Sequence, residues 1–404
     1  MRLCKAIFCV LLISLFSSLA PALADGNIQY VDANDTTGCS AAVVVGDAPR
    51  AITTQLLPLD QDGEIVGKAN ADAQIQKVLA DLEAVLKTAD SGFDKILRLH
   101  VCLANDEIVK NATEALARTF TGKAKPAVTF VVGNLTHFDA LVAMDAVAVS
   151  SLRDPTGAVR HFSADGVYHK TATAHVAILP PGPVFYLSGQ PTPGKDMGPA
   201  AEKTLKTLQE TLAFLKLSNL NVVQLKVFMG PIAQAALVEQ EVIKAFAPQA
   251  SPPIVFVEWI AGIPIEIELI AAAPQAPVDA DTVTFLTPPG VKASPVYSRI
   301  ANVSRGKTIY ISGLYGTTPD DGAAQIHEIF ATLKKLLAKT GSDLEHMAKA
   351  TYYCCTDDAS RKLNEIRPQY YSPKRPPAAS KAMVRGVGKP GSGITIDMIA
   401  VARK

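Results

Sequence analysis

The sequence predicts an α+β fold built from three tandem copies of one small domain. The main observation is a repeated unit in which a proline opens a β-rich run, a Gly-containing turn follows, and an alternating strand ends in a carboxylate. The unit starts at Pro126, Pro252 and Pro377, so its copies lie 126 and 125 residues apart. That period is too long for a solenoid and suits a small domain. The closing carboxylates are Asp145, Glu268 and Asp397.

The second observation is that the same order of elements precedes each unit. In the first copy, strands at 41–45 and 52–57 flank the turn Gly46-Asp47-Ala48, which predicts a hairpin. A helix at 74–89 follows, then a strand at 96–103 and a helix at 109–120. The first helix is predicted because four apolar residues fall on one face, namely Val78, Leu82, Val85 and Leu86.

The second and third copies repeat this plan. The second has hairpin strands at 174–179 and 184–189, a helix carrying Leu205, Leu208, Leu212 and Leu215, the strand VVQLKVFM and the helix VEQEVIKAFA. The third has strands at 297–303 and 308–312, a helix carrying Ile329, Leu333, Leu336 and Leu337, a strand at 348–354 and a helix at 361–370. We therefore expect domains at 25–152, 158–273 and 282–404, joined by proline-containing linkers at 153–157 and 274–281.

Residues 1–24 have the pattern of a secretory signal peptide. Arg2 and Lys5 precede an apolar run, and Ala22-Leu23-Ala24 offers small residues for cleavage. The alternative, a membrane anchor, is disfavoured because the apolar run is shorter than the roughly 20 residues that a spanning helix needs. We expect an exported protein, periplasmic or extracellular, without stable membrane insertion after cleavage.

Charge and composition narrow the possible partners. The chain has 39 basic and 38 acidic residues, and 48% of its residues are hydrophobic. This balance gives no electrostatic reason to expect a nucleic acid as partner. Cys39, Cys102, Cys354 and Cys355 show no metal-ligand spacing, and their disulfide status is left open. The seven histidines are scattered, so surface or strand-end positions are expected for them, and neither a metal nor a cofactor is predicted.

The motifs together resemble the RidA/YjgF family of reactive intermediate imine deaminases. The resemblance rests on Ser188-Gly189-Gln190 and Ser312-Gly313-Leu314 after the second strand, on the proline-led strands, and on IEIELIA closing the second copy. It implies a chorismate-mutase-like α+β domain, with a mixed sheet and two helices on one face. The family forms homotrimers with ligand pockets between subunits. Three fused copies imply a pseudo-trimer within one chain, and hence a monomer.

The resemblance also implies a chemistry, the hydrolysis of enamines and imines to 2-oxo acids and ammonia. In the family, an arginine two residues after the strand-opening proline binds the substrate carboxylate, and a glutamate on the last strand orients water or moves a proton. The arginine position holds Val128, Ile254 and Ala379. Arg385 lies too far along its strand to replace it. The glutamate position holds Ala143, Glu266 and Thr395, so only the second copy retains the carboxylate.

Glu266 is therefore the candidate catalytic residue. Glu268 shares its strand face roughly 7 Å away, so two carboxylates in a dry pocket would raise the proton affinity of one. The alternative is a solvated strand face without function, and for the Ser-Gly pairs a simple bulge. A small-molecule ligand is expected in a pocket completed by a neighbouring copy, with Ser40 or Tyr297 as candidate partners. The candidate binding residues are Ser188, Gly189, Gln190, Tyr297, Ser312, Gly313 and Glu268.

Two functions of different classes follow. The first is an exported protein that binds a small molecule or a partner between copies and has lost the usual deaminase step, since the arginine is absent and export separates the chain from cytoplasmic sources of short-lived imines. The second is a divergent enamine or imine deaminase, a hydrolase that uses Glu266 on a substrate without a carboxylate. A ribonuclease, a label sometimes attached to this family, is disfavoured because no basic stripe is present.

Overall fold

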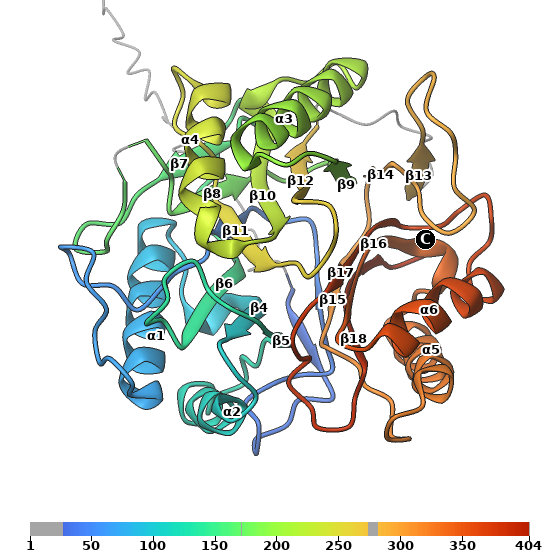
Figure 1. The fold of residues 1–404 in the computed structure, drawn as a ribbon, viewed down its shortest axis with the longest axis horizontal. Coiled ribbons are helices and arrows are strands. Elements are labelled where there is room, and N and C mark those ends of the chain that lie inside the picture. The colour runs from blue at the N-terminus through green and yellow to red at the C-terminus, as the bar shows by residue number, and fades with distance from the viewer. Residues whose placement is uncertain (1–26, 171, 274–281, 404) are drawn as a thin grey trace, which may run out of the picture.

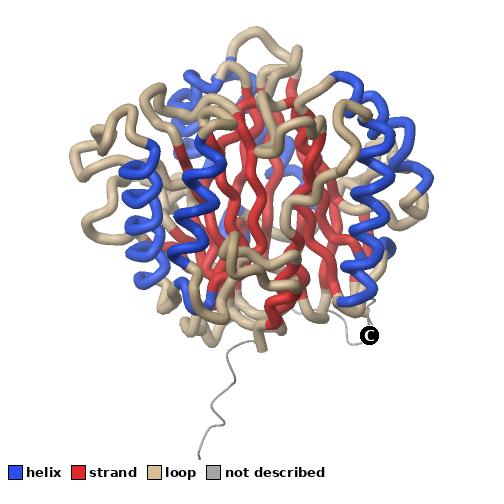
Figure 2. Tube along the Cα trace, turned by 90° about the horizontal axis from the view of Figure 1, so that it is seen from below, coloured by secondary structure: helices blue, strands red, loops and turns tan. Residues whose placement is uncertain are grey.

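The computed structural model describes residues 27–170, 172–273 and 282–403. The predicted signal peptide at 1–24 and the linker at 274–281 lie outside these residues. The described chain forms three six-stranded sheets, with the strands inside and the helices around the outside (Figures 1 and 2). The predicted α+β class with three tandem copies is confirmed.

The first copy follows the predicted order. Its α1 begins after Asn70, whose side chain accepts a hydrogen bond from the Ala73 N–H, and it buries the four predicted apolar residues. The elements are β1 (Gln29–Val31), β2 (Ala42–Val45), β3 (Arg50–Thr53), α1 (Ala71–Thr88), β4 (Ile96–Leu103), α2 (Ile108–Thr119), β5 (Ala127–Val132) and β6 (Val142–Val149).

The second copy repeats this series. Its middle strand β10 covers the predicted segment VVQLKVFM. The elements are β7 (Arg160–Phe162), β8 (Val176–Leu179), β9 (Val184–Thr192), α3 (Met197–Phe214), β10 (Val222–Met229), α4 (Ala235–Phe246), β11 (Ile254–Glu258) and β12 (Ile265–Ala272).

The third copy differs from the prediction in its second helix. This helix, α6, begins at Asp357, four residues earlier than expected, because the Thr356 hydroxyl caps it by accepting from the Ala359 N–H. A short 3₁₀ turn follows α6 at Pro368. The elements are β13 (Val283–Leu286), β14 (Ile300–Val303), β15 (Thr308–Ile311), α5 (Gly322–Lys339), β16 (Met347–Cys354), α6 (Asp357–Ile366), β17 (Ala378–Met383) and β18 (Ile394–Val401).

Each sheet combines strands from two copies. The first has the order β5-β4-β6-β3-β8-β7, so β7 and β8 of the second copy extend a sheet of the first. The second has the order β11-β10-β12-β9-β14-β13, and the third has β17-β16-β18-β15-β2-β1. The exchange is cyclic, because the third sheet is completed by β1 and β2 of the first copy.

The predicted hairpins are therefore wrong. β2 and β3 are joined by residues 46–49, yet β2 pairs with β15 and β3 pairs with β8. The strands flanking Gly182 separate in the same way, since β8 pairs with β3 and β9 pairs with β12 and β14. The physical reason is that equivalent strands of different copies offer the same hydrogen-bonding edge and the same side-chain alternation. Pairing between copies is thus locally equivalent to pairing within one copy.

The cyclic exchange leads to a prediction about mass. Because each copy already pairs with both others, the contacts that a homotrimer of separate domains would supply are made within one chain. We expect light scattering to give the mass of one chain, at most 42.7 kDa, at all protein concentrations. A stable threefold larger particle would contradict internal closure.

The inner faces of the three sheets meet in the middle of the molecule. Apolar side chains from all three copies form one cluster there, including Val43, Ile52, Tyr186, Tyr310 and Ile399. The outer faces pack against the helices in three separate cores. The polar residues of the last and middle strands thus lie between the copies. Within the described ranges, no helix combines the length and the apolar character that a membrane crossing requires.

Candidate functional site

Strand register places the predicted site positions at equivalent points in the three sheets. Glu266 on β12 lies opposite Phe228 on β10. Ala143 lies opposite Cys102, and Thr395 lies opposite Tyr353. The second copy alone therefore has a carboxylate at this point.

Glu266 lies against the backbone of Gly189. The pairing of β12 with β9 is irregular between Ile267 and Leu269, which brings the Ser188-Gly189 segment close to the Glu266 side chain. A Cβ atom built on Gly189 would come within 1.8 Å of the Glu266 Oε1. Glycine is thus required for the carboxylate to occupy its place.

Strands of the third copy close this site. The Ser188 hydroxyl donates to the Ser298 carbonyl at 2.5 Å and accepts from the Ala379 N–H at 2.8 Å. The Gly189 N–H donates to the Ser380 hydroxyl at 3.1 Å, and this hydroxyl donates to Glu268 Oε2 at 2.7 Å. The structure thus brings together four of the predicted residues, Ser188, Gly189, Glu266 and Glu268, at the junction of the second and third copies.

The two carboxylates of this site, Glu266 and Glu268, have different electrostatic surroundings. Burial, followed by the neighbouring Glu268 charge, raises the pKa of Glu266 to about 7, while Ser380 and Arg299 act in the opposite direction. Glu268 is buried and forms an ion pair with Lys349 at 2.7 Å. Lys349 lies beside Glu268, whereas no cation lies as close to Glu266. Glu266 is therefore the carboxylate that can gain or lose a proton near neutral pH.

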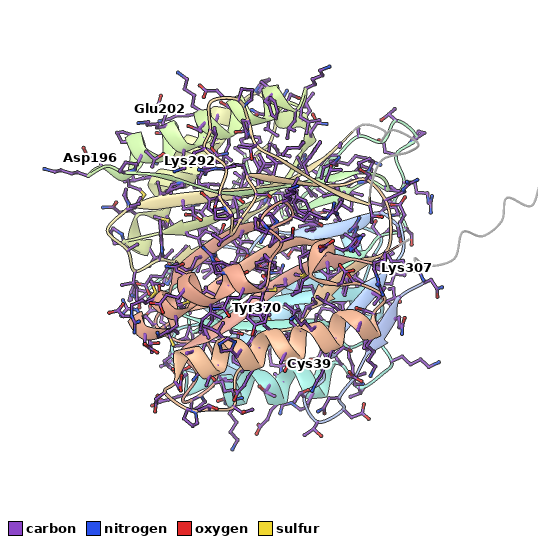
Figure 3. All side chains as sticks on the ribbon, turned by 90° about the vertical axis from the view of Figure 1, so that its right-hand side faces the viewer. Cys39, Asp196, Glu202, Lys292, Lys307 and Tyr370 are labelled. Carbon is purple, nitrogen blue, oxygen red and sulfur yellow. The ribbon has the colours of Figure 1, made fainter. Side chains whose placement is uncertain are left out.

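A cavity of about 640 Å³ adjoins the site on the α3 side. It lies between α3 and the loop that joins β13 to β14, and Figure 3 shows Lys292 of this loop on the same side of the molecule as the start of α3. The predicted residue Gln190 lines it and donates to the Thr211 hydroxyl at 3.1 Å. The predicted residue Tyr297 lies under the Arg299 guanidinium, 5.1 Å from its ring centroid.

The equivalent junction of the third and first copies contains Ser312 and Gly313 but no equivalent carboxylate. The Ser312 hydroxyl accepts from the Val128 N–H at 2.8 Å and donates to the Ser40 carbonyl at 2.5 Å. Gly313 faces Thr395 and the Tyr315 hydroxyl. Hydroxyl groups thus fill the place that Glu266 has in the second copy.

The junction of the first and second copies is different again. Thr54 and Gln55 replace the Ser-Gly pair, and the Gln55 side chain donates to the Phe256 carbonyl at 3.0 Å. A cavity of about 260 Å³ remains, lined in part by His169, His175 and Ile254. Both ring nitrogens of His175 have backbone partners, the Ala164 N–H and the Tyr168 carbonyl.

Arg385 is engaged away from the Glu266 site. It forms a bidentate ion pair with Glu258 at 2.7 and 3.0 Å, and Asn134 also donates to that carboxylate. Val128, Ile254 and Ala379, at the positions expected for an arginine, lie at these junctions and are buried. Arg299, which the sequence analysis did not single out, lines the cavity of about 640 Å³ together with Gln190.

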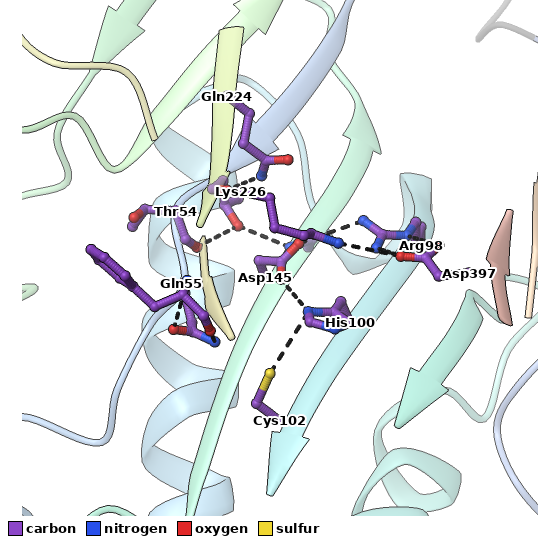
Figure 4. Close-up of polar contacts among 12 residues, drawn as sticks. Thr54, Gln55, Arg98, His100, Cys102, Asp145, Gln224, Lys226 and Asp397 are labelled. Atoms are coloured by element: carbon purple, nitrogen blue, oxygen red, sulfur yellow. Dashed lines mark hydrogen bonds and ion pairs between the residues drawn. The ribbon is translucent and has the colours of Figure 1, made fainter. Parts of the chain in front are cut away.

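Buried charges of all three copies meet where the inner faces of the sheets join. Asp397 of the third copy binds Arg98 of the first and Lys226 of the second, the latter at 3.4 Å (Figure 4). Asp145 accepts from His100 Nδ1 at 2.9 Å and lies 3.5 Å from Arg98. Together with the Glu268–Lys349 pair, these residues form what we call the central ion cluster.

The central ion cluster fixes the charges of its members. Burial by itself would raise the pKa of Asp397, but Arg98, Lys226 and Lys349 outweigh it and hold the pKa well below its usual range. Burial and the Lys226 charge lower the pKa of His100 despite Asp145. His100 is fully buried, so the expected surface or strand-end position is wrong for it.

The closing carboxylates Asp145, Glu268 and Asp397 are buried too, so the solvated-face alternative is wrong for Glu268. The sequence contained a signal for their partners, because each mainly apolar middle strand carries a single Arg or Lys, at Arg98, Lys226 and Lys349. Such cations on strands buried along their whole length require counter-charges nearby. Among the described residues, all four cysteines are free thiols, and no group of His, Cys, Asp or Glu could hold a metal ion.

The chain is similar to a family model and to several known proteins. The family model described as Endoribonuclease L-PSP matches residues 40–150 and 290–402. Protein DfrA of Myxococcus xanthus is 30% identical over 118 residues, which cover 28% of this chain and 88% of DfrA. RutC family protein UK114 of Drosophila melanogaster is 35% identical over 94 residues, which cover 23% of this chain and 67% of that protein.

A solved structure of a YjgF family member from Neisseria meningitidis is also similar. It is 24% identical, its match covers 30% of this chain and 96% of that chain, and the TM-score is 0.23.

Proposed function

The chain belongs to the RidA/YjgF family, whose model is described as Endoribonuclease L-PSP, and from this premise we propose that it binds a small molecule between its second and third copies. The observation that carries the proposal is Glu266, a carboxylate whose pKa is raised to about 7 by burial and by Glu268. It pairs in the sheet with Pro191, which lines the cavity of about 640 Å³. No other junction of the described chain has a carboxylate at this position.

The geometry suits a ligand with a polar, reacting end. Hydrogen bonds from the third copy hold Ser188 and Gly189 in place, so the backbone around Glu266 is fixed before a ligand arrives. A carboxylate that is half protonated near neutral pH can donate to a carbonyl or accept from an amine or a water molecule. Carbonyl compounds and their imines offer these groups.

A second candidate function is hydrolysis of an imine or enamine, and the raised pKa of Glu266 favours it. Glu266 accepts a proton from the water that adds to the C=N carbon and passes it to the nitrogen, which gives a neutral carbinolamine. Glu266 then accepts the proton of the carbinolamine hydroxyl and transfers it to the nitrogen as the C–N bond breaks, so that ammonia leaves and a carbonyl compound remains. Glu266 ends in its initial state, so atoms and charges balance.

Two other parts of the proposal rest on the sequence. Export to the periplasm or the outside of the cell is proposed from the residue pattern at 1–24. Loss of the usual deaminase step is proposed because Val128, Ile254 and Ala379 offer no guanidinium. The near-neutral charge of +1 and the use of Arg98, Lys226 and Lys349 in buried ion pairs do not support a nuclease, despite the name of the family model.

The test compares two glycines in equivalent positions. In Gly189→Ala the new Cβ meets Glu266 Oε1 at 1.8 Å, whereas in Gly313→Ala the nearest atom, Thr395 Oγ1, is 3.0 Å away. We expect 2-oxobutanoate and related 2-oxo acids to stabilise the wild type in thermal-shift and calorimetric measurements. Gly189→Ala should lose this binding and Gly313→Ala should retain it.

The reverse pattern would place the ligand at the junction of the third and first copies. Absence of binding by the folded wild type to any member of a panel of 2-oxo acids, aldehydes and amines would overturn the proposed function.

A further inference from the structure

Arg50 is a buried cation whose partners among the described residues are hydroxyl groups rather than carboxylates. Only 3% of it is exposed, and its Nη1 donates to the Thr308 hydroxyl at 3.0 Å and to the Tyr310 hydroxyl at 3.3 Å. Its Nε is buried and has no hydrogen-bond acceptor within the described ranges. A buried charge with an unused donor costs free energy unless an anion or a water molecule satisfies it.

Arg50 keeps its positive charge in these surroundings. Burial by itself would lower its pKa, but Tyr310, Tyr186 and Asp47 outweigh burial, and the pKa is raised. Asp47 is exposed, and its carboxylate accepts from the Gly182 N–H at 2.9 Å. Burial also raises the pKa of Tyr186, so the hydroxyl of Tyr186 stays protonated and can donate a hydrogen bond. The guanidinium therefore remains positive among neutral hydroxyl groups.

The position of this cation is special to the first copy. Arg50, Val184 and Thr308 begin the equivalent strands β3, β9 and β15, and each pairs with the last residue of the closing strand of its copy. The second copy thus has an apolar side chain at this point, and the third has a neutral hydroxyl. Two residues further along, these copies have Tyr186 and Tyr310, which belong to the central apolar cluster. One copy therefore supplies a cation, and the other two supply hydroxyl groups around it.

The turns before these three strands lie at one end of the ring, because the strands are equivalent. They comprise residues 46–49, 180–183 and 304–307. Arg305 and Lys307 are exposed on the third turn, against one exposed acidic residue, Asp47, on the first (Figure 3 labels Lys307). An excess of positive side chains raises the local concentration of anions. Arg50 directly follows the first turn, so the buried guanidinium lies next to a surface that attracts anions.

We propose that Arg50 binds a monovalent inorganic anion of the size of chloride, which accepts hydrogen bonds from Arg50 Nε and from the Tyr186 hydroxyl. One guanidinium balances one negative charge, whereas a doubly charged oxyanion would bring an uncompensated charge into apolar surroundings. The anion joins groups of the first and second copies, so it stabilises the closed ring. The site is separate from that of Glu266, since neither Arg50 nor Tyr186 lines the cavity of about 640 Å³.

The experiment compares thermal unfolding of the wild type in sodium chloride and in sodium gluconate, whose anion is too large for a buried site. Both salts are used at the same ionic strength and at pH 7, so that general screening is equal. Each tenfold rise in chloride above its dissociation constant should raise the Tm by about 2 °C relative to gluconate, because chloride binds only the folded chain. In crystals soaked in bromide, anomalous scattering should place a bromide ion within hydrogen-bond distance of Arg50 Nε.

Arg50→Met retains an unbranched side chain without the charge and should remove the chloride dependence of the Tm. Lys307→Gln is the matched control, since it removes an exposed cation at the same end of the ring and should leave that dependence unchanged. A folded Arg50→Met variant that responds to chloride like the wild type, or a lost response in Lys307→Gln, would overturn the role of Arg50. If Arg50→Met does not fold, the wild-type crystal decides, because a water molecule in place of bromide at Arg50 Nε overturns the proposal. An equal Tm of the wild type in chloride and gluconate overturns it as well.

Discussion

Asp397→Asn should lower the free energy of unfolding by about 3–5 kcal/mol, because it leaves two buried cations without their main counter-charge. Asp397 is the point at which all three copies meet, since it binds Arg98 of the first and Lys226 of the second. Asparagine has nearly the same shape but no charge. Asp145 lies 3.5 Å from Arg98 and forms no ion pair with Lys226, so it replaces the lost charge only in part.

Urea unfolding at pH 7 measures this effect. The matched control is Glu365→Gln, which breaks an exposed pair with Arg361 and Lys362 and should change the free energy of unfolding far less than Asp397→Asn, because water screens exposed charges. Asp397 has a lowered pKa, so its contribution is present above the pKa of the unfolded chain, near 4, and is lost as the pH falls further. A folded Asp397→Asn variant as stable as the wild type would show that the central ion cluster does not hold the copies together.

The sequence predicts much of this arrangement because the three copies constrain one another. The repeated closing acid at Asp145, Glu268 and Asp397 pointed to one equivalent position, and strand register places all three opposite the middle strands. Side-chain alternation then puts the three acids on the same face of their sheets. The pattern did not reveal whether that face is exposed or buried, because an acidic residue can either face solvent or pair with a buried cation.

Strand exchange could not be predicted for a related reason. The segment at 46–49 permits a tight turn, and the flanking strands have the composition of a hairpin. Each strand instead pairs with the strand of another copy that is equivalent to its expected hairpin partner: β2 pairs with β15, and β3 pairs with β8. Local sequence determines the strand but not which of three similar partners it meets. Arg299 was not predicted for the same reason: it belongs to the third copy, and the cavity that it lines is formed largely by residues of the second copy.

The three junctions differ in how their polar groups are satisfied. Thr395 and Tyr315 fill the junction of the third and first copies with hydroxyl groups, and Gln55 uses its amide to bind a backbone strand at the junction of the first and second. At both of these junctions the polar groups bind other groups of the protein. Ala143 and Thr395, at the position of Glu266, have no group that titrates near pH 7. A fused chain can specialise one junction while the others maintain the ring, which identical subunits of a homotrimer cannot do.

Glu266→Gln should have two effects that a purely structural role would not combine. If the site hydrolyses an imine or enamine, the rate should fall by about 10²- to 10⁴-fold, because the variant cannot transfer a proton. The second effect is on stability. The pKa of Glu266 is raised to about 7, so folding favours its protonated form. Its contribution to stability is complete below the pKa of the unfolded chain and is lost as the pH rises through about 7.

The stability effect is measurable without knowledge of the ligand. Between pH 4.5 and 8 the wild type should lose on the order of 3 kcal/mol of unfolding free energy through this one group, and Glu266→Gln should remove that loss. The charges that face Glu266 are Glu268 on its own strand and Arg299 of the third copy, and neither is changed in the variant. Glu210→Gln, an exposed change of the same kind beside the cavity, should leave the pH dependence as it is in the wild type. Parallel stability curves for the wild type and Glu266→Gln would mean that folding does not raise the pKa of Glu266, and the site would then lack the group titrating near neutral pH on which both proposed functions rest.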